Sequence, residues 1–275
     1  MGFRKITFDT TSDGLDKLCE RLSVLGYDEL EIVDIHRVSL YVADEVSPDP
    51  LPDIRNAVEF EPVVTHVAQE DWMNNWKQYY EPIAVGRRIL IQPEWLELHN
   101  PDNRAVFWCE PGVSFGTGSH ATTRLCLELL DEHVAPGAAV ADLGCGSGIL
   151  AVSALLLGAK SAFAADIDPQ AVKVASTNAV RNGFPDMTVR QLDLLESFDV
   201  PGNNDIVCAN LISDIIRTLA PKLAACVKIG GRLFASGILQ EHAQDVSAVL
   251  ESFGLERAGI RTSGGWAAID LIRRA

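Results

Sequence analysis

The feature that most constrains this chain is a glycine-rich turn at residues 140–150, which read Val-Ala-Asp-Leu-Gly-Cys-Gly-Ser-Gly-Ile-Leu. An apolar strand enters the turn, three glycines follow at alternate positions, and an apolar helix leaves it. Glycine lets the backbone turn sharply and lets a ligand approach without a Cβ in the way. The N-terminus of the following helix offers free N–H groups to that ligand. The segment predicts a ligand-binding strand–turn–helix unit, although ordinary strand–helix turns also use glycine.

A carboxylate occupies the matching place on the next predicted strand. Asp166 lies 22 residues after Gly144, at the end of the strand expected over residues 161–166. A carboxylate there can accept hydrogen bonds from both hydroxyls of a ribose. The alternative role, capping the next helix, suits Asp168 better, because Pro169 then becomes the first helical residue. The turn and Asp166 together predict nucleoside binding.

The spacing of the glycines separates two classes of nucleoside site. The dinucleotide fingerprint is G-x-G-x-x-G, whereas here the third glycine, Gly148, comes one place early. The turn instead resembles the first motif of class I S-adenosylmethionine-dependent methyltransferases. In that resemblance the amino acid end of the cofactor lies over the turn, which makes Gly144 and Gly146 candidate contacts. Asp142 either faces the cofactor ammonium or is a structural cap.

Two further polar residues follow predicted strands, at the edge where open α/β sheets bind ligands. Asp193 ends the strand over residues 188–192 and is a candidate for the adenine amino group or for capping its own loop. Asn210 follows the strand over residues 205–209. Its amide either bonds the cofactor or steers the acceptor nitrogen, or it forms an Asx turn or the N-cap of the helix expected over residues 213–223. Amine-directed methyltransferases often carry Asn-Pro-Pro-aromatic here. This chain has Asn-Leu-Ile-Ser, which does not support a planar amide nitrogen as the target.

An unusual loop over residues 110–123 precedes the glycine turn. It contains three glycines, Phe115, His120 and Thr123, and leads into a helix that we expect to begin near Thr122. Such a loop beside a helix N-terminus suits closure over a ligand, with Phe115 and Thr123 as candidate cofactor contacts. Thr123 is otherwise an ordinary first-turn residue. For His120 a structural hydrogen bond is favoured over catalysis.

The order of predicted elements indicates two domains. Strands over residues 4–9, 30–33, 38–42 and 62–67, with a leucine-spaced helix near 15–25 and a weaker one near 53–60, form a βαββαβ pattern. We therefore expect a small ferredoxin-like α+β domain over residues 1–68. Residues 69–80 carry aromatic side chains on one helical face and predict an amphipathic linker helix rather than a ligand cage. Residues 81–275 alternate helices and apolar strands and predict a Rossmann-like α/β domain.

Composition excludes several classes of partner. The 275 residues include 23 Lys and Arg against 38 Asp and Glu, a net charge of −15, so direct binding to nucleic acid is not expected. The acidic surface either attracts a basic protein or serves solubility. The six cysteines form no C-x-x-C pair, which predicts reduced thiols in a cytoplasmic protein and no metal site. No apolar stretch reaches the length of a membrane span.

The chain as a whole resembles the bacterial PrmA methyltransferases, which act on ribosomal protein L11. The most specific shared segment is Phe-Gly-Thr-Gly-x-His-x-Thr-Thr at residues 115–123, and the others include Gly86-Arg87-Arg88 and Ser236-Gly237-Ile238-Leu239. The resemblance implies S-adenosylmethionine contacts at Thr123, Gly144, Asp166 and Asn210. It also implies that the N-terminal domain captures the ribosomal protein, a basic large-subunit protein.

We therefore expect a protein N-methyltransferase that acts on amino groups of ribosomal protein L11, with Asn210 as its catalytic residue. Lysine side chains are the expected acceptors, and the N-terminal amine is a further candidate. Residues 211–214 depart from the family pattern, and a related subgroup methylates lysines of other proteins, so a different protein target is the alternative. A nicotinamide oxidoreductase is disfavoured by the glycine spacing. A cofactor-binding protein without activity is disfavoured by the intact set of cofactor residues.

Overall fold

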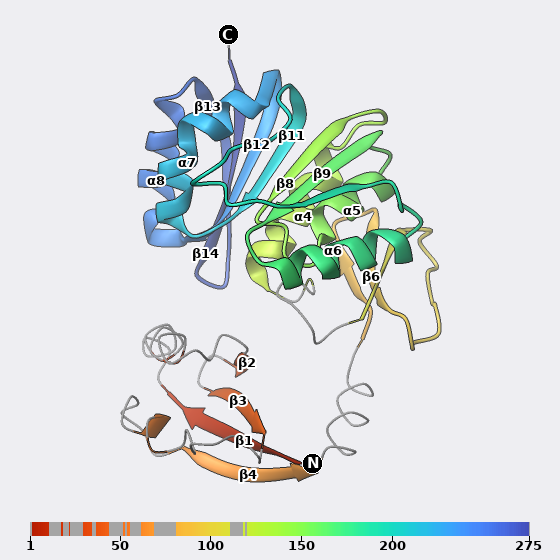
Figure 1. The fold of residues 1–275 in the computed structure, drawn as a ribbon, viewed down its shortest axis with the longest axis vertical. Helices are drawn as coiled ribbons and strands as arrows, with labels where there is room; N and C mark the ends of the chain where they lie inside the picture. Colours follow the sequence, from red (N-terminus) through yellow and green to blue (C-terminus); the bar gives the residue numbers. More distant parts are fainter. Residues whose placement is uncertain are drawn as a thin grey trace. The chain divides into compact units, whose positions relative to one another are not determined.

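The computed structural model describes residues 2–10, 18, 22, 30–34, 37–43, 52, 54–55, 62–68, 81–110, 118 and 120–274. The chain divides into two compact units, Met1–Tyr80 and Glu81–Ala275 (Figure 1). The linker helix predicted over residues 69–80 lies outside the described residues, as does Phe115 in the loop before the glycine turn. Both therefore stay predictions.

The first unit contains a four-stranded sheet. Its strands are β1 (Gly2–Asp9), β2 (Leu30–Asp34), β3 (Arg37–Ala43) and β4 (Val63–Ala68). They lie in the order β2-β3-β1-β4 with every neighbouring pair antiparallel, which is the strand order of the predicted ferredoxin-like fold. Alternate side chains of β1, Ile6 and Phe8, are fully buried in one core with Leu22 and Ile54, which are helical in the described chain. Side chains two residues apart in a strand point to the same face of the sheet, so Ile6 and Phe8 lie on the face of β1 that is buried.

The second unit is built on a seven-stranded sheet in the order β10-β9-β8-β11-β12-β14-β13. Its strands are β8 (Ala139–Leu143), β9 (Ser161–Asp166), β10 (Thr188–Gln191), β11 (Asn204–Asn210), β12 (Val227–Leu239), β13 (Leu255–Ser263) and β14 (Trp266–Arg273). The first five run parallel. The sequence predicts two late strands at residues 256–262 and 266–272 that pair antiparallel, and β13 and β14 confirm this pair. This arrangement confirms the Rossmann-like class I sheet.

Helices cover both faces of this sheet, which is why its strands read as apolar runs. One face carries α4 (Ala121–His133), α5 (Ile149–Leu156) and α6 (Pro169–Arg181), and the other carries α7 (Ser213–Cys226) and α8 (Ala243–Glu251) (Figure 1). A 3₁₀ turn, η1 (Gln240–His242), precedes α8. Each face has its own core: Leu127 and Val140 belong to the first, Leu219 and Leu233 to the second.

A small three-stranded sheet extends the α4–α6 side. Its strands are β5 (Ile83–Val85), β6 (Ile89–Pro93) and β7 (Ala105–Cys109), in the order β5-β6-β7. The apolar runs Ile89-Leu90-Ile91 and Val106-Phe107-Trp108 predict β6 and β7, whereas β5, with only three residues, was not predicted. Asn182 at the end of α6 holds β7, because its side chain bonds the Trp108 N–H at 2.7 Å and the Trp108 carbonyl at 2.9 Å. This sheet therefore packs as part of the second unit.

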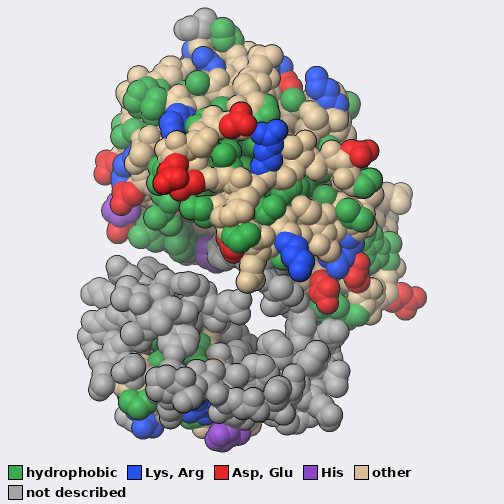
Figure 2. Space-filling model, in the orientation of Figure 1, with side chains coloured by type: hydrophobic (Ala, Val, Ile, Leu, Met, Phe, Trp, Pro, Cys, Tyr) green, Lys and Arg blue, Asp and Glu red, His purple; other side chains and the backbone are tan. Residues whose placement is uncertain are grey.

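Figure 2 shows basic and acidic side chains interspersed over the visible face of the second unit. Among the helices the structure describes, none is long and apolar enough to span a membrane.

Candidate active site

Three of the predicted site residues meet at one edge of the large sheet. Gly144 follows β8, Asp166 ends β9 and Asn210 ends β11, and β8 lies between the other two strands with all three parallel. The chain leaves β8 toward β9 on one side and returns to β11 on the other, so β8 borders the topological switch point (Figure 1). Open α/β sheets bind their ligands in the crevice at this point. The topology therefore brings Gly144, Asp166 and Asn210 to the expected binding edge.

The glycine turn is shaped by its backbone and by its neighbours. Gly144, Gly146 and Gly148 all have left-handed φ angles, +75°, +50° and +75°. The Gly144 N–H donates to the Ala165 carbonyl at 2.8 Å, which ties the turn to the end of β9. A Cβ added to Gly144 would lie 2.3 Å from the Leu211 Cδ2 atom. The backbone angle favours glycine at this position, and a side chain there would also force the Leu211 side chain to shift.

Asp166, at the end of β9, is half-buried, and both of its carboxylate oxygens accept hydrogen bonds from backbone N–H groups. Its Oδ2 accepts a hydrogen bond from the Gly146 N–H at 2.8 Å, and its Oδ1 accepts one from the Asp168 N–H at 3.0 Å. A carboxylate oxygen has more than one acceptor site, so both oxygens retain capacity for ligand hydroxyls. Asp168 caps α6 by accepting from the Gln170 N–H at 2.8 Å, with Pro169 in the first turn. The predicted division between the two aspartates is confirmed for Asp168.

Two buried polar atoms near the turn lack a partner among the described residues. They are Oδ1 of Asp142, a fully buried residue, and Oγ1 of Thr123, which is 1% exposed. The other oxygen of Asp142 accepts from the Ala151 N–H of α5 at 3.1 Å, so this side chain does act as a cap. Burial raises the pKa of the Asp142 carboxyl to about 7. Unpaired buried polar atoms are costly, so these two atoms are candidates for contact with a polar ligand; Oε1 of Gln92 and Oγ of Ser153 are likewise buried without a partner among the described residues.

The first turn of α4 brings Thr123 to the same edge. Ser236 is paired in register with Asn210, and its hydroxyl donates to the Thr122 carbonyl at 3.4 Å. His120 is the N-cap of α4: its Nδ1 lies 2.8 Å from the Thr122 hydroxyl and accepts from the Thr122 N–H at 3.4 Å. Burial lowers the pKa of His120, and its ring lies edge-on to Trp266 at 5.2 Å between centroids. The favoured structural role of His120 is confirmed.

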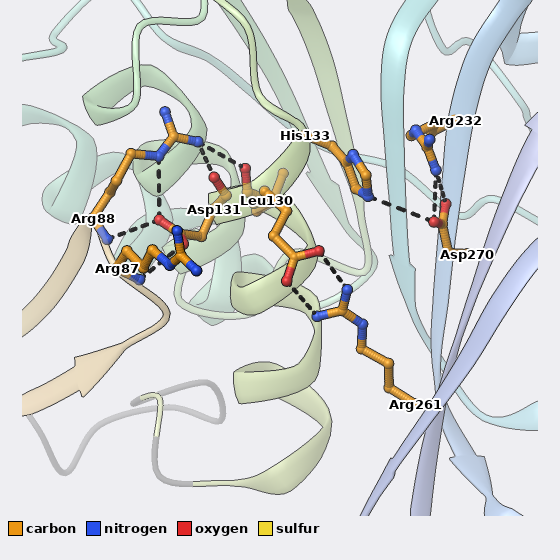
Figure 3. Close-up of polar contacts among 9 residues, drawn as sticks. Arg87, Arg88, Leu130, Asp131, His133, Arg232, Arg261 and Asp270 are labelled. Carbon is orange, nitrogen blue, oxygen red and sulfur yellow. Dashed lines mark hydrogen bonds and ion pairs between the residues drawn. The ribbon is translucent and has the colours of Figure 1, made fainter.

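The last turn of α4 is held by three successive side chains that reach three different elements (Figure 3). Asp131 accepts hydrogen bonds from the Arg87 and Arg88 backbone N–H groups at 2.9 Å each. Glu132 pairs with the Arg261 guanidinium at 2.5 Å. His133 lies 3.6 Å from the Asp270 carboxylate, and Asp270 in turn pairs with Arg232 at 2.6 Å. These contacts tie α4 to the β5–β6 turn, to β13 and to β14. Held at both ends, α4 gives Thr123 a defined place.

The other two polar residues at strand ends differ in how they are engaged. The Asn210 side chain is partly exposed and makes no hydrogen bond with a residue that the structure describes. The alternative that Asn210 caps α7 is wrong, because Ile212 occupies the N-cap position and no side chain caps that helix. Asp193 does cap its own loop, since its Oδ1 accepts from the Leu195 N–H at 2.8 Å and the Glu196 N–H at 3.3 Å. The cap engages one of its two oxygens.

Sequence reasoning assigned no role to three residues that shape the site: Leu211 over Gly144, Asp131 beneath the Gly86–Arg88 turn, and Gly237 against the Leu211 backbone. Of these three, only Gly237 could have been found from the sequence, because an isolated glycine in an apolar strand often marks a bulge or a close backbone approach.

A Rossmann-like sheet with this glycine turn after β8, a carboxylate at the end of β9 and an amide at the end of β11 defines a class I S-adenosylmethionine-dependent methyltransferase. Comparison with known proteins narrows this class. The chain belongs to the ribosomal protein L11 methyltransferase (PrmA) family, whose model matches residues 17–274.

Individual relatives agree with the family model. The chain is 46% identical over 204 residues to the ribosomal protein L11 methyltransferase of Pelotomaculum thermopropionicum, over 74% of this chain and 66% of that protein. It is 38% identical over 265 residues to the one from Pelobacter propionicus, over 90% of this chain and 85% of that protein. The crystal structure of a ribosomal protein L11 methylase from Lactobacillus delbrueckii subsp. bulgaricus superimposes with a TM-score of 0.65 at 30% identity, over 72% of this chain and all of that one.

Proposed function

We propose that this chain transfers methyl groups from S-adenosylmethionine to amino groups of ribosomal protein L11, on lysine side chains and the N-terminal amine. The observation that carries the proposal is the Asn210 amide, partly exposed and unbonded within the described structure, one residue before the Leu211 side chain that covers Gly144. Because no described residue bonds this side-chain amide, it is available to a ligand at the binding edge of the sheet. The names of the relatives support ribosomal protein L11 as the target.

The groups at this edge fit the cofactor part by part. The unpartnered atoms of Thr123 and Asp142 suit the carboxylate and ammonium of its amino acid end, over Gly144 and Gly146. Asp166 retains acceptor capacity for the ribose hydroxyls. We assign Asp193 to the adenine amino group through the oxygen that does not cap the loop, and Phe115 and Asn210 to the remaining cofactor contacts.

When bound, S-adenosylmethionine supplies an electrophilic methyl group, so the work of the protein is to position a neutral amine. A lysine amine is protonated near neutral pH and must lose that proton before it can attack. Burial in the site favours the neutral amine. The Asn210 carbonyl can then accept a hydrogen bond from an amine N–H and direct the nitrogen lone pair, which is the catalytic role that we assign to it.

The acidic first unit supports capture of a basic protein. Residues 1–80 contain seven Lys and Arg against sixteen Asp and Glu, so this part of the chain carries more than half of the net charge of −15. The negative charge of this unit attracts a basic ribosomal protein and speeds their encounter. The same negative charge repels the phosphate backbone of nucleic acid. A reduced, cytoplasmic setting suits the five described cysteines, which are all buried and unpaired.

The target is tested by transfer of labelled methyl from S-adenosylmethionine. The full chain should label purified ribosomal protein L11 far faster than an unrelated basic protein of similar lysine content at equal concentration. Equal labelling of both would contradict the target and favour the alternative, a protein-lysine methyltransferase with a different substrate. Labelling that weakens as salt rises through the screening range would support charge-assisted capture.

The role of Asn210 has its own test. Asn210→Ala should lower kcat more than it lowers the affinity for S-adenosylhomocysteine, because the amide acts on the acceptor as well as on the cofactor. Equal losses in both would leave Asn210 as a cofactor contact only.

A further inference from the structure

One glycine in the shared Ser-Gly-Ile-Leu segment sits where β12 changes register. The pairing of β12 with β14 shifts between Ser236 and Ile238, so Gly237 lies at an irregularity of the strand. Its φ angle is +81°, in the left-handed region that favours glycine. Ser236, the residue before it, pairs with Asn210 of β11 and accepts a hydrogen bond from the Leu211 N–H at 2.9 Å. The irregularity therefore lies directly beside the loop that follows Asn210.

The Cα of Gly237 faces the backbone of that loop. A Cβ at this position would lie 2.4 Å from the Leu211 carbonyl oxygen, 2.8 Å from its carbonyl carbon and 3.0 Å from its nitrogen. All three are backbone atoms, so the contact is not relieved by turning a side chain. The Leu211 side chain meanwhile packs on Gly144, where an added Cβ would lie 2.3 Å from Cδ2. Leu211 therefore lies between two glycines: its backbone packs against Gly237, and its side chain packs against Gly144 of the glycine turn.

We propose that Gly237 is a positioning residue for methyl transfer: by admitting the Leu211 backbone, it sets the place of the adjacent Asn210 amide relative to the glycine turn. This inference rests on the proposed acceptor role of Asn210. Real Cβ atoms essentially never lie closer than 3.0 Å to such neighbours, so a side chain at position 237 forces the Leu211 backbone to move away from the 2.4 Å contact. Misplacement of a reacting group by about 1 Å can cost roughly 100-fold in rate.

The chain offers a matched control on the same strand. Gly230 also lies in β12 and has a φ angle of +79°, but a Cβ added there would meet nothing within 4 Å. Gly230→Ala and Gly237→Ala therefore carry the same backbone strain, and they differ in the collision with Leu211. Comparing them separates positioning from the general cost of an alanine in a left-handed conformation.

The experiment measures kcat with ribosomal protein L11, the affinity for S-adenosylhomocysteine by calorimetry, and the melting temperature of the full-length variants. Gly237→Ala should lower kcat at least about ten-fold relative to Gly230→Ala, with a change in affinity below about three-fold. A kcat within about two-fold of Gly230→Ala would overturn the proposal, as would a loss matched by an equal loss of cofactor affinity. If Gly237→Ala does not fold, Gly237→Asn against Gly230→Asn decides, because asparagine tolerates this backbone better and still adds the Cβ.

Asn210→Ala separates this inference from the proposed function. If that variant keeps its turnover, Asn210 has no acceptor role and both ideas fail. If Asn210→Ala loses turnover while Gly237→Ala matches Gly230→Ala, the role of Asn210 stands and the inference about Gly237 alone is wrong.

Discussion

Truncating Asp131 should destabilise the second unit far more than truncating its neighbour Glu132. The Asp131 side chain is 6% exposed and accepts the Arg87 and Arg88 backbone N–H groups at 2.9 Å each, with the Arg88 guanidinium at 3.2 Å. Hydrogen bonds to a charged group contribute about 1.5–3 kcal/mol each, so losing the two backbone bonds costs roughly 3–6 kcal/mol of unfolding free energy. The ion pair of Glu132 with Arg261 is 50% and 34% exposed, and such surface pairs contribute about 0–1 kcal/mol.

The two alanine variants form a matched pair, because both sit in the last turn of α4 and the difference in helix propensity is only a few tenths of a kcal/mol. Urea denaturation of the full chain is followed by tryptophan fluorescence, and the wild-type signal of Trp72 and Trp76 in the first unit is common to both variants. The change that differs between the variants then reports the unfolding of the second unit, which holds Trp95, Trp108 and Trp266. We expect Asp131→Ala to lose at least about 2 kcal/mol more than Glu132→Ala. Equal losses would refute the claim that Asp131 anchors the β5–β6 turn.

Three further predictions address the site and the division of the chain. Asp166→Ala should lower the affinity for S-adenosylmethionine about ten-fold or more, since it removes charged hydrogen bonds, and calorimetry showing unchanged affinity in the folded variant would contradict the ribose role. The pKa of the Asp142 carboxyl is about 7 when folded against 3.8 in its ordinary state, so the folded chain retains that proton and its stability falls as pH rises between these values. Asp142→Asn should lose this fall in cofactor-free denaturation series run at about pH 5 and about pH 8, and an unchanged slope would show that Asp142 does not cause it. A fragment from Glu81 onward should still bind S-adenosylmethionine but lose most activity on folded ribosomal protein L11, because the first unit no longer raises the local substrate concentration; equal rates would rule out capture by that unit.

The large sheet and its binding edge were predictable because their signals are local. An apolar strand, a glycine turn and a polar residue at the next strand end each occupy a few consecutive residues, and parallel topology then brings those ends together. The strand β5 was not predicted, because its three residues, Ile83–Val85, are too few to show the alternation of apolar and polar side chains that indicates a strand. The N-cap role considered for Asn210 is wrong because the chain runs two residues further before α7 begins.

Contacts between distant segments were not predictable from the sequence. The bond from the Gly146 N–H to Asp166, the packing of Leu211 on Gly144, and the approach of Leu211 to Gly237 each depend on which strands are neighbours and in what register. The anchoring of the Gly86–Arg88 turn by Asp131 joins residues more than forty positions apart. A glycine or an aspartate at such a position has many local explanations, and only the fold selects one.

The most direct test of the account is peptide-resolved mass spectrometry of ribosomal protein L11 after incubation with the full chain and S-adenosylmethionine, beside the same reaction with Asn210→Ala. We predict methyl groups on amine nitrogens, at lysine side chains or the N-terminus, with the wild-type chain, and strongly reduced modification with the variant at cofactor concentrations that saturate both. Methylation confined to other atoms, or no methylation by a wild-type chain that binds the cofactor, would contradict the central claim.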